Sequence, residues 1–358
     1  MRPVWLLAIV VVAPSFGSAQ TTPREPRLVL VRQHPTPVIT TRTPGAEGNR
    51  YGFEGGRAVK VGGTYHLFTT EMVADPMWVK TRFGHWTSRD RVSWTRVATV
   101  RESSGEFEGK DPRASLWSPL VVWDPGDRRW NLFYVAYRSM PGDGTRFLLN
   151  HAGEIWRAVS ARKKLEGIGG PFEDLGVVMR PGPDSLPWEG LQGTDSFFPW
   201  PAAGGWHALY GSARTETNPI AHWLVGPAVA ASLGGPWRRV SEGNPAPIEP
   251  HFIENPIVTE VPGGWIAVYD SETPDAVGWA WSSDGVHWGR GHGLVIQPKA
   301  GEWSKDVRTP LGLVPEGGDS FTLLYTGFEQ TPDWPRILAT GKSTNTCAVG
   351  MVEVRLER

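Results

Sequence analysis

A pair of strand-like segments recurs five times along this chain, and each pair is joined by a turn rich in glycine. The second segment of each pair is aromatic, and the five read Tyr65-His-Leu-Phe, Trp130-Asn-Leu-Phe-Tyr, Trp206-His-Ala-Leu-Tyr, Trp265-Ile-Ala-Val-Tyr and Phe321-Thr-Leu-Leu-Tyr. A strand-built repeat with a period of about 50 to 80 residues is typical of β-propellers, whose four-stranded blades surround a channel. The repeat therefore predicts an all-β fold, a five-bladed β-propeller of four-stranded antiparallel blades.

Further features agree with this prediction. Two more segments with one polar side follow the first pair, at 79–87 and 94–100, which completes a unit of four. A mainly helical fold is excluded because 43 glycines and 32 prolines are scattered through the 358 residues. Alternating segments at the two chain ends, 27–33 and 348–356, are expected to complete a terminal blade and to cover exposed strand edges.

The N-terminus has the pattern of an export signal. Arg2 gives a positive start, residues 4–13 are apolar, and small residues allow cleavage after Ala19. Ten apolar residues are fewer than the about 20 that a membrane span requires. We therefore expect a signal peptide over 1–19, a disordered lead-in over 20–26 and one catalytic propeller domain over 27–358, in a secreted or periplasmic protein without a membrane anchor.

Charge and metal-ligand patterns narrow the possible partners. The chain has 36 basic and 37 acidic residues and no basic stripe, so nucleic acid is not an expected partner. The nine histidines show no spacing typical of a metal site, so no metal or other cofactor is expected. Cys347 is the only cysteine and has no partner within the chain for a disulfide. The oligomeric state is not indicated.

Three carboxyl groups occupy equivalent places in the repeat. Glu54, Asp195 and Glu254 each lie 11 residues before the aromatic residue that opens the second strand of their unit. In the two units with longer turns, Trp117 and Arg308 lie 13 residues before it. In a ring of blades, equivalent starts of the innermost strands point at one place, so the three carboxyl groups are expected to converge.

Converging carboxyl groups suit the hydrolysis of a glycosidic bond. This reaction needs one carboxylic acid to protonate the leaving oxygen and one carboxylate to activate water or attack the sugar. A third acid nearby raises the pKa of the proton donor. The alternative reading, in which acids at strand starts cap turns or face solvent, accounts for one such residue more easily than for three at the same offset.

Several short motifs resemble those of five-bladed glycoside hydrolases of family 43 and the related, invertase-like family 32. The segment beginning Gly193-Thr-Asp195 resembles the start of the third blade in family 43, and Glu254-Asn-Pro resembles the Glu-Gly-Pro that opens its fourth blade. The turn Ser232-Leu-Gly-Gly-Pro-Trp resembles the turn that closes its third blade. The chain departs from the family at Glu54, where family 43 has an Asp followed by Pro.

This resemblance implies a secreted hydrolase that cleaves a plant or microbial oligosaccharide or polysaccharide. Glu254 would be the general acid, Asp195 would raise its pKa and orient it, and Glu54 would be the base. The resemblance favours inversion at the anomeric carbon. A structural calcium ion in the channel is possible in this family.

Other residues near the strand starts are candidates for contacts with the carbohydrate substrate. Trp117 is expected to stack on an apolar sugar face, and Arg308 is expected either to bind the substrate or to balance the acids as an ion-pair partner. The remaining candidates lie close to these positions in the sequence and are Arg57, Ser118, His251 and Asn255.

Three other functions stay open at this stage. A glycoside phosphorylase or transglycosylase would use the same acid, but phosphate binding needs more basic residues than the strand starts provide. A non-catalytic carbohydrate-binding propeller is favoured if Glu54 cannot reach the substrate. A sialidase is disfavoured because the two Ser-x-Asp-x-Val-x-Trp turns, at 88–94 and 282–288, are one residue shorter than the sialidase Asp-box.

Overall fold

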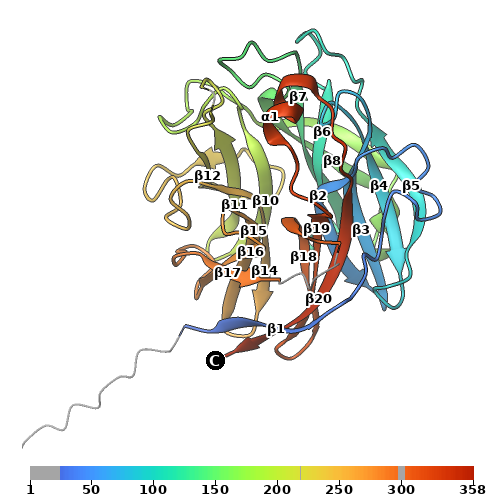
Figure 1. Cartoon of the computed structure of the whole chain (residues 1–358). Coiled ribbons are helices and arrows are strands. Elements are labelled where there is room, and N and C mark those ends of the chain that lie inside the picture. Colours follow the sequence, from blue (N-terminus) through green and yellow to red (C-terminus); the bar gives the residue numbers. More distant parts are fainter. Residues whose placement is uncertain (1–24, 218, 297–302) are drawn as a thin grey trace, which may run out of the picture.

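The computed structural model describes residues 25–217, 219–296 and 303–358. The predicted signal peptide and residues 20–24 of the predicted lead-in lie outside these described residues. Within them the chain is almost entirely β-structure, with one short 3-10 helix, η1 (Leu165–Gly169), and one α-helix, α1 (Trp334–Thr340) (Figure 1). No helix in the described part of the chain is long and apolar enough to cross a membrane.

The described strands pair into antiparallel units of four, and the units follow one another along the chain. Unit 1 contains β2 (Gly52–Val61), β3 (Thr64–Ala74), β4 (Lys80–Ser88) and β5 (Thr95–Glu102). Unit 2 contains β6 (Ser115–Asp124), β7 (Arg129–Arg138), β8 (His151–Lys163) and β9 (Phe172–Met179). Unit 3 contains β10 (Asp195–Ala202), β11 (Gly205–Ala213), β12 (Trp223–Ala230) and β13 (Arg238–Arg239). Unit 4 contains β14 (Ile253–Val261), β15 (Gly264–Ser271), β16 (Ala276–Ser282) and β17 (His292–Val295).

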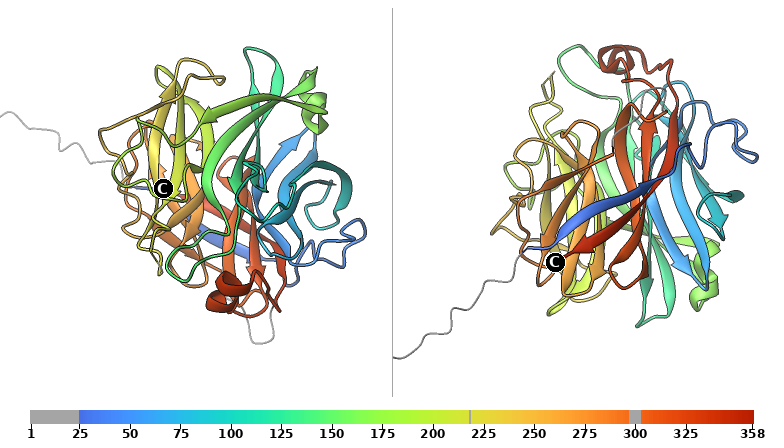
Figure 2. Two further views of the ribbon diagram at one scale, coloured as in Figure 1. Left: turned by 90° about the horizontal axis from the view of Figure 1, so that it is seen from above. Right: turned by 60° about the horizontal axis from the view of Figure 1, so that its bottom comes forward.

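The last unit is built from both ends of the chain. It contains β18 (Asp306–Gly317), β19 (Ser320–Phe328), β20 (Cys347–Glu357) and β1 (Arg27–Gln33). β1 runs antiparallel to β20, and the two lie side by side in Figure 2. The expectation that the terminal segments complete a blade is therefore confirmed by the strand pairing.

The first strands of the units surround the axis of the molecule. β2, β6, β10, β14 and β18 pack against one another in this order, and β18 also packs against β2, which closes the ring. A single parallel bridge between Gly52 and Cys347 joins the last unit to the first. The predicted all-β fold of four-stranded antiparallel sheets is confirmed.

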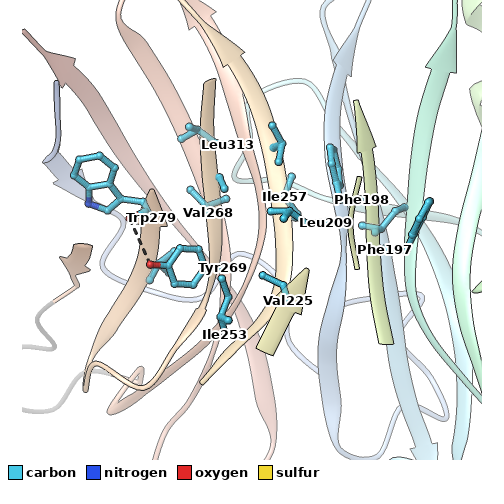
Figure 3. Packing of buried hydrophobic residues seen from close by; sticks show 14 of the residues in the cluster. Phe197, Phe198, Leu209, Val225, Ile253, Ile257, Val268, Tyr269, Trp279 and Leu313 are labelled. Carbon is cyan, nitrogen blue, oxygen red and sulfur yellow. Dashed lines mark hydrogen bonds between the residues drawn. The ribbon is translucent and has the colours of Figure 1, made fainter. Parts of the chain in front are cut away.

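Large apolar side chains fill the space between neighbouring units. Phe197 of unit 3 packs against Phe133 of unit 2, with ring centroids 5.3 Å apart, and against Trp237 of its own unit at 5.0 Å. Figure 3 shows the continuation of this core from Phe198 to Leu313. Each large side chain that is fully buried contributes about 1.5–3 kcal/mol, so this packing holds the units rigidly around the channel.

A β-bulge interrupts the first strand of each unit near the predicted site. In units 1 to 4 the ladder register shifts directly after Glu54, Trp117, Asp195 and Glu254, and in the last unit it shifts after Val307. The following residues have left-handed backbone conformations, with φ values of 65° at Gly55, 51° at Ser118, 43° at Ser196 and 50° at Asn255.

These bulges explain why the regular strand pattern in the sequence, which predicts first strands over 57–61, 119–123, 197–201, 256–261 and 309–314, begins later than the strands themselves. The alternation of inward and outward side chains is broken at the bulge, so the regular pattern begins only after it. In the structure the first strands begin earlier, at residues 52, 115, 195, 253 and 306.

The buried His85 and the half-buried His66 in unit 1 make the stability of the fold dependent on pH. Nδ1 of His66 and Nε2 of His85 lie 3.0 Å apart, and the His85 ring stacks on Phe68. Burial lowers the pKa of His85 to about 3 and also lowers the pKa of His66. Between pH 6.5 and about 3 the unfolded chain therefore binds protons that the folded chain does not.

Replacement of His85 by Phe is expected to flatten this dependence, because the aromatic ring stays and the titration is removed. As the pH is lowered from 6.5 to about 3, the unfolding free energy of the wild type should fall more than that of the variant. The difference should be a few kcal/mol, at most about 5 kcal/mol. Urea unfolding at several pH values measures this difference. Equal slopes for the two proteins would show that His85 does not resist protonation in the folded state.

Candidate active site

A cavity of about 400 Å³ opens at the N-terminal ends of the first strands, on the side of the molecule where α1 lies in Figure 1. All three predicted catalytic residues line it, each from a different unit. Of the six predicted substrate-contact residues, five also line it: Trp117, Ser118, His251, Asn255 and Arg308. Its walls are largely aromatic, and the rings that form them are Trp78, Trp117, Tyr137, Phe147, Trp223, Phe252 and Trp334.

Glu54 is buried and held by two donors. Nε1 of Trp78 donates to its Oε2 at 3.1 Å, and Nη2 of Arg308 donates to its Oε1 at 3.3 Å. Trp78 is itself fixed, because it stacks on Trp334 with ring centroids 5.8 Å apart. The extra methylene relative to Asp is therefore accommodated by donors that hold the Glu54 carboxylate at the cavity wall.

Asp195 has both oxygens occupied by hydrogen bonds. The hydroxyl of Tyr137 and the backbone N–H of Ser196 (2.7 Å) donate to Oδ1, while Nε1 of Trp223 donates to Oδ2 at 2.8 Å. Burial raises the pKa of Asp195, whereas the hydrogen bonds from Tyr137 and Trp223 lower it. A carboxyl group so fully engaged is suited to an electrostatic and orienting role.

Glu254 differs from the other two acids because no hydrogen bond ties its carboxyl group to the described part of the chain, and the residue lies partly exposed in the cavity wall. Burial raises the pKa of Glu254 well above its usual value, and the charges of Asp195 and Asp270 add to the shift, while Arg308 opposes it. A carboxyl group that has a raised pKa and is free to reach a ligand is suited to donate a proton.

A fourth acid, Asp270, belongs to the same electrostatic cluster and was not predicted from the sequence. It lies directly opposite Glu254 in the β14–β15 ladder and is only 1% exposed. Its Oδ2 lies 3.2 Å from Nη2 of Arg308 and accepts a hydrogen bond from the Thr309 hydroxyl at 3.2 Å. Burial raises the pKa of Asp270 to about 6, although Arg308 opposes the shift.

Arg308 forms ion pairs with two of the acids. Its guanidinium group bridges Glu54 and Asp270 and lies over the Trp334 ring, 5.0 Å from the centroid. Of the two roles considered for Arg308, the ion pairs with the acids are formed in the structure, and the residue also lines the cavity. The single positive charge between Glu54 and Asp270 reduces the repulsion among the neighbouring carboxyl groups.

Hydrogen bonds link the left-handed residues of the bulges from one unit to another. The Ser118 hydroxyl donates to Oδ1 of Asn255 at 2.6 Å, and the backbone N–H of Asn255 donates to Oγ of Ser196 at 3.0 Å. A Cβ atom at Gly55 would lie 2.6 Å from the Ser118 Oγ, so glycine is required there. Ser118 and Asn255 line the cavity, but their side-chain hydrogen bonds join one unit to another.

Trp117 and His251 are among the predicted contacts that line the cavity, whereas Arg57 is not. The Trp117 ring is anchored by hydrogen bonds from Nε1 to the Trp78 carbonyl (3.0 Å) and to Ser115 Oγ (2.6 Å), and His251 is exposed at the cavity rim. Arg57 lies outside this cavity, in a separate one. It is three residues beyond Glu54, about 10 Å further along a strand, so the prediction that it contacts a ligand bound by the acids does not agree with its position.

Sequence reasoning missed three donors to the acids and the fourth acid, which are Trp78, Tyr137, Trp223 and Asp270. Asp270 had a detectable signal, since it is the one acid that directly follows the aromatic repeat Trp265-Ile-Ala-Val-Tyr in a second strand. The two tryptophans had none, because Trp78 lies in the turn after β3 and Trp223 begins β12.

No group of three or more His, Cys, Asp or Glu side chains among the described residues is arranged to hold a metal ion. A calcium ion in the channel would therefore depend on backbone carbonyl oxygens and water for most of its six to eight ligands.

Comparisons with known proteins agree with the architecture. No protein-family model matches the chain, and no curated protein matches it in sequence. Solved structures of glycoside hydrolases do match. Zg3597, a family 117 glycoside hydrolase from the marine bacterium Zobellia galactanivorans, is 15% identical, and the match covers 92% of this chain and 90% of that one, with a TM-score of 0.59.

Two further structures give the same result. BT0996, solved as a complex with RGII, is 13% identical over 90% of this chain and 92% of its own, with a TM-score of 0.63. CoXyl43, a family 43 β-xylosidase/α-arabinofuranosidase from a compost metagenome, is 14% identical over 92% of this chain and 95% of its own, with a TM-score of 0.55. The chain has the propeller fold of these glycoside hydrolases, as the resemblance in its motifs predicts.

Proposed function

We propose that the protein is an exported glycoside hydrolase that cleaves a plant or microbial oligosaccharide or polysaccharide with inversion. The observation that carries this proposal is the convergence of Glu54, Asp195 and Glu254, from three units, on one aromatic-lined cavity. Tryptophan rings on the wall provide apolar faces on which the C–H faces of a sugar stack.

The acids divide the chemistry between them. The protonated Glu254 carboxyl group donates its proton to the glycosidic oxygen as the bond to the anomeric carbon breaks. Glu54 accepts a proton from a water molecule whose oxygen attacks that carbon from the opposite face, so both products leave with a complete hydroxyl group. Asp195, held by Tyr137 and Trp223, keeps the Glu254 pKa high through its negative charge.

The similar structures support a carbohydrate ligand. CoXyl43 was solved in complex with xylotriose, and BT0996 in complex with RGII. A phosphorylase is less well supported, since Arg308 is the only lysine or arginine among the described residues that line the cavity, and it is bound to Glu54 and Asp270.

A panel of nitrophenyl glycosides, with arabinofuranoside, xyloside, galactoside and fucoside, tests the proposal. Hydrolysis of at least one, with NMR detection of the inverted anomer as the first product, is the expected result. Binding of a sugar without any turnover would instead favour the second candidate, a non-catalytic carbohydrate-binding propeller.

A further inference from the structure

The channel has a second cavity at its other end. The C-terminal ends of all five first strands line it, and its volume is about 460 Å³. Ser118 and Asn255, which line the first cavity and are joined by a hydrogen bond, lie nearer the N-terminal ends of the same strands. The two cavities therefore open on opposite faces of the molecule.

Arg57 lies in this second cavity without an acidic partner. Its Nη1 donates to the Val121 carbonyl at 2.5 Å, and its guanidinium group lies over the Phe198 ring, 4.6 Å from the centroid. Within the described residues it forms no ion pair, and burial lowers its pKa to about 10 without any compensating acid. A desolvated guanidinium group with unused N–H donors is suited to bind a planar anion in two parallel hydrogen bonds.

The other charges of the cavity do not satisfy Arg57. Lys60 forms an ion pair with Glu316, with Nζ 2.6 Å from Oε2, so the charge of Lys60 is already balanced. Glu260 lies exposed at the rim. Arg57 therefore carries the unpaired positive charge of this cavity, and a negatively charged ligand would form an ion pair with it.

The walls of the cavity indicate which kind of negatively charged ligand would fit it. Four tryptophan side chains line it, and the rings of Trp123 and Trp265 are partly exposed. Trp123 packs against Trp130 with ring centroids 5.5 Å apart, which fixes its orientation. Rigid aromatic faces beside a guanidinium group match a sugar ring that bears a carboxylate, because the ring stacks while the carboxylate pairs with the arginine.

We propose that this second cavity is a non-catalytic binding site for an acidic saccharide, a chain that contains a uronic acid, whose carboxylate pairs with Arg57. The first cavity is unsuited to such a ligand because four acidic residues line it, Glu54, Asp195, Glu254 and Glu272. The second lacks the converging acids of a hydrolase, since Glu260 is the only acid among the described residues that line it.

Calorimetric titration of the full chain with digalacturonate, galactobiose and acetate tests the site. Digalacturonate is expected to bind, while the neutral disaccharide and acetate bind at least about tenfold more weakly, because each lacks one of the two recognised features. Arg57→Met should weaken digalacturonate binding by about tenfold or more, whereas Glu254→Gln should leave it unchanged.

Other outcomes would overturn the proposal. Loss of digalacturonate binding in Glu254→Gln but not in Arg57→Met would place the acidic saccharide in the first cavity. If acetate binds as tightly as digalacturonate, the site recognises a carboxylate and not a saccharide. If digalacturonate does not bind at concentrations of about 1 mM and above, the second cavity is not a binding site for acidic saccharides. If Arg57→Met does not fold, Trp123→Ala gives the second measurement, with the same expected loss. These readouts do not depend on turnover, so they stand apart from any failure of the proposed hydrolase activity.

Discussion

Replacement of Glu54 by Gln is expected to abolish hydrolysis of every substrate, with a loss of about 10³-fold or more in kcat. The amide keeps the size of the side chain but accepts no proton from the attacking water. Because water activation is needed whatever the leaving group, activated aryl glycosides should be affected as strongly as natural ones. Steady-state rates on a nitrophenyl glycoside and on an oligosaccharide measure the effect.

The matched control for this variant is Glu242→Gln, which makes the same chemical change at an exposed residue outside the cavity. It should retain wild-type rates. Melting curves of the Glu54 variant should show a folded protein, since Arg308 keeps Asp270 as a partner. Substantial activity of Glu54→Gln would show that another group activates the water and would remove the base assignment.

Replacement of Glu254 by Gln is expected to give a loss that depends on the leaving group. Proton donation contributes roughly 10²–10⁴ in rate, and this factor should be lost fully on an oligosaccharide. It should be small on an activated aryl glycoside, because a good leaving group needs little protonation. The ratio of kcat values on the two substrates, in wild type and variant, measures the effect.

The pH dependence gives a second test of the same assignment. Glu254 must be protonated to act, so activity should fall as the pH rises through its pKa, which burial and the neighbouring acids raise above the usual range. The variant has no such group, and its residual activity should lack that alkaline limb. A variant with full oligosaccharide activity and an unchanged profile would show that the equal spacing of the acids reflects only the repeat.

The equivalence of the strand starts was visible in the sequence. Glu54, Asp195 and Glu254 share one offset, and equal offsets in a repeat give equal places in a ring, so the sequence was sufficient to bring them to one cavity. Trp117 and Arg308 follow from the same argument. The antiparallel units and the pairing of the two terminal segments were also predictable, since they depend on local alternation and turn residues.

The partners of the acids depended on contacts between distant segments. Trp78, Trp223 and Tyr137 donate from turns and outer strands whose side-chain directions no repeat specifies. Asp270 acquires its place because it lies opposite Glu254 across a ladder. The electrostatic role of each acid is a property of this surrounding cluster.

The chain by itself determined which residues lie at the channel, because a repeat with constant spacing maps sequence position onto position along the strand. Only the tertiary structure decided which of the two cavities a residue lines. Arg57 is three residues from Glu54, yet the bulge at Gly55 and the rise of an extended strand place it in the second cavity. Pairing with the neighbouring strands sets how far along the channel a residue lies and which way its side chain points after a bulge. Local sequence does not encode this pairing.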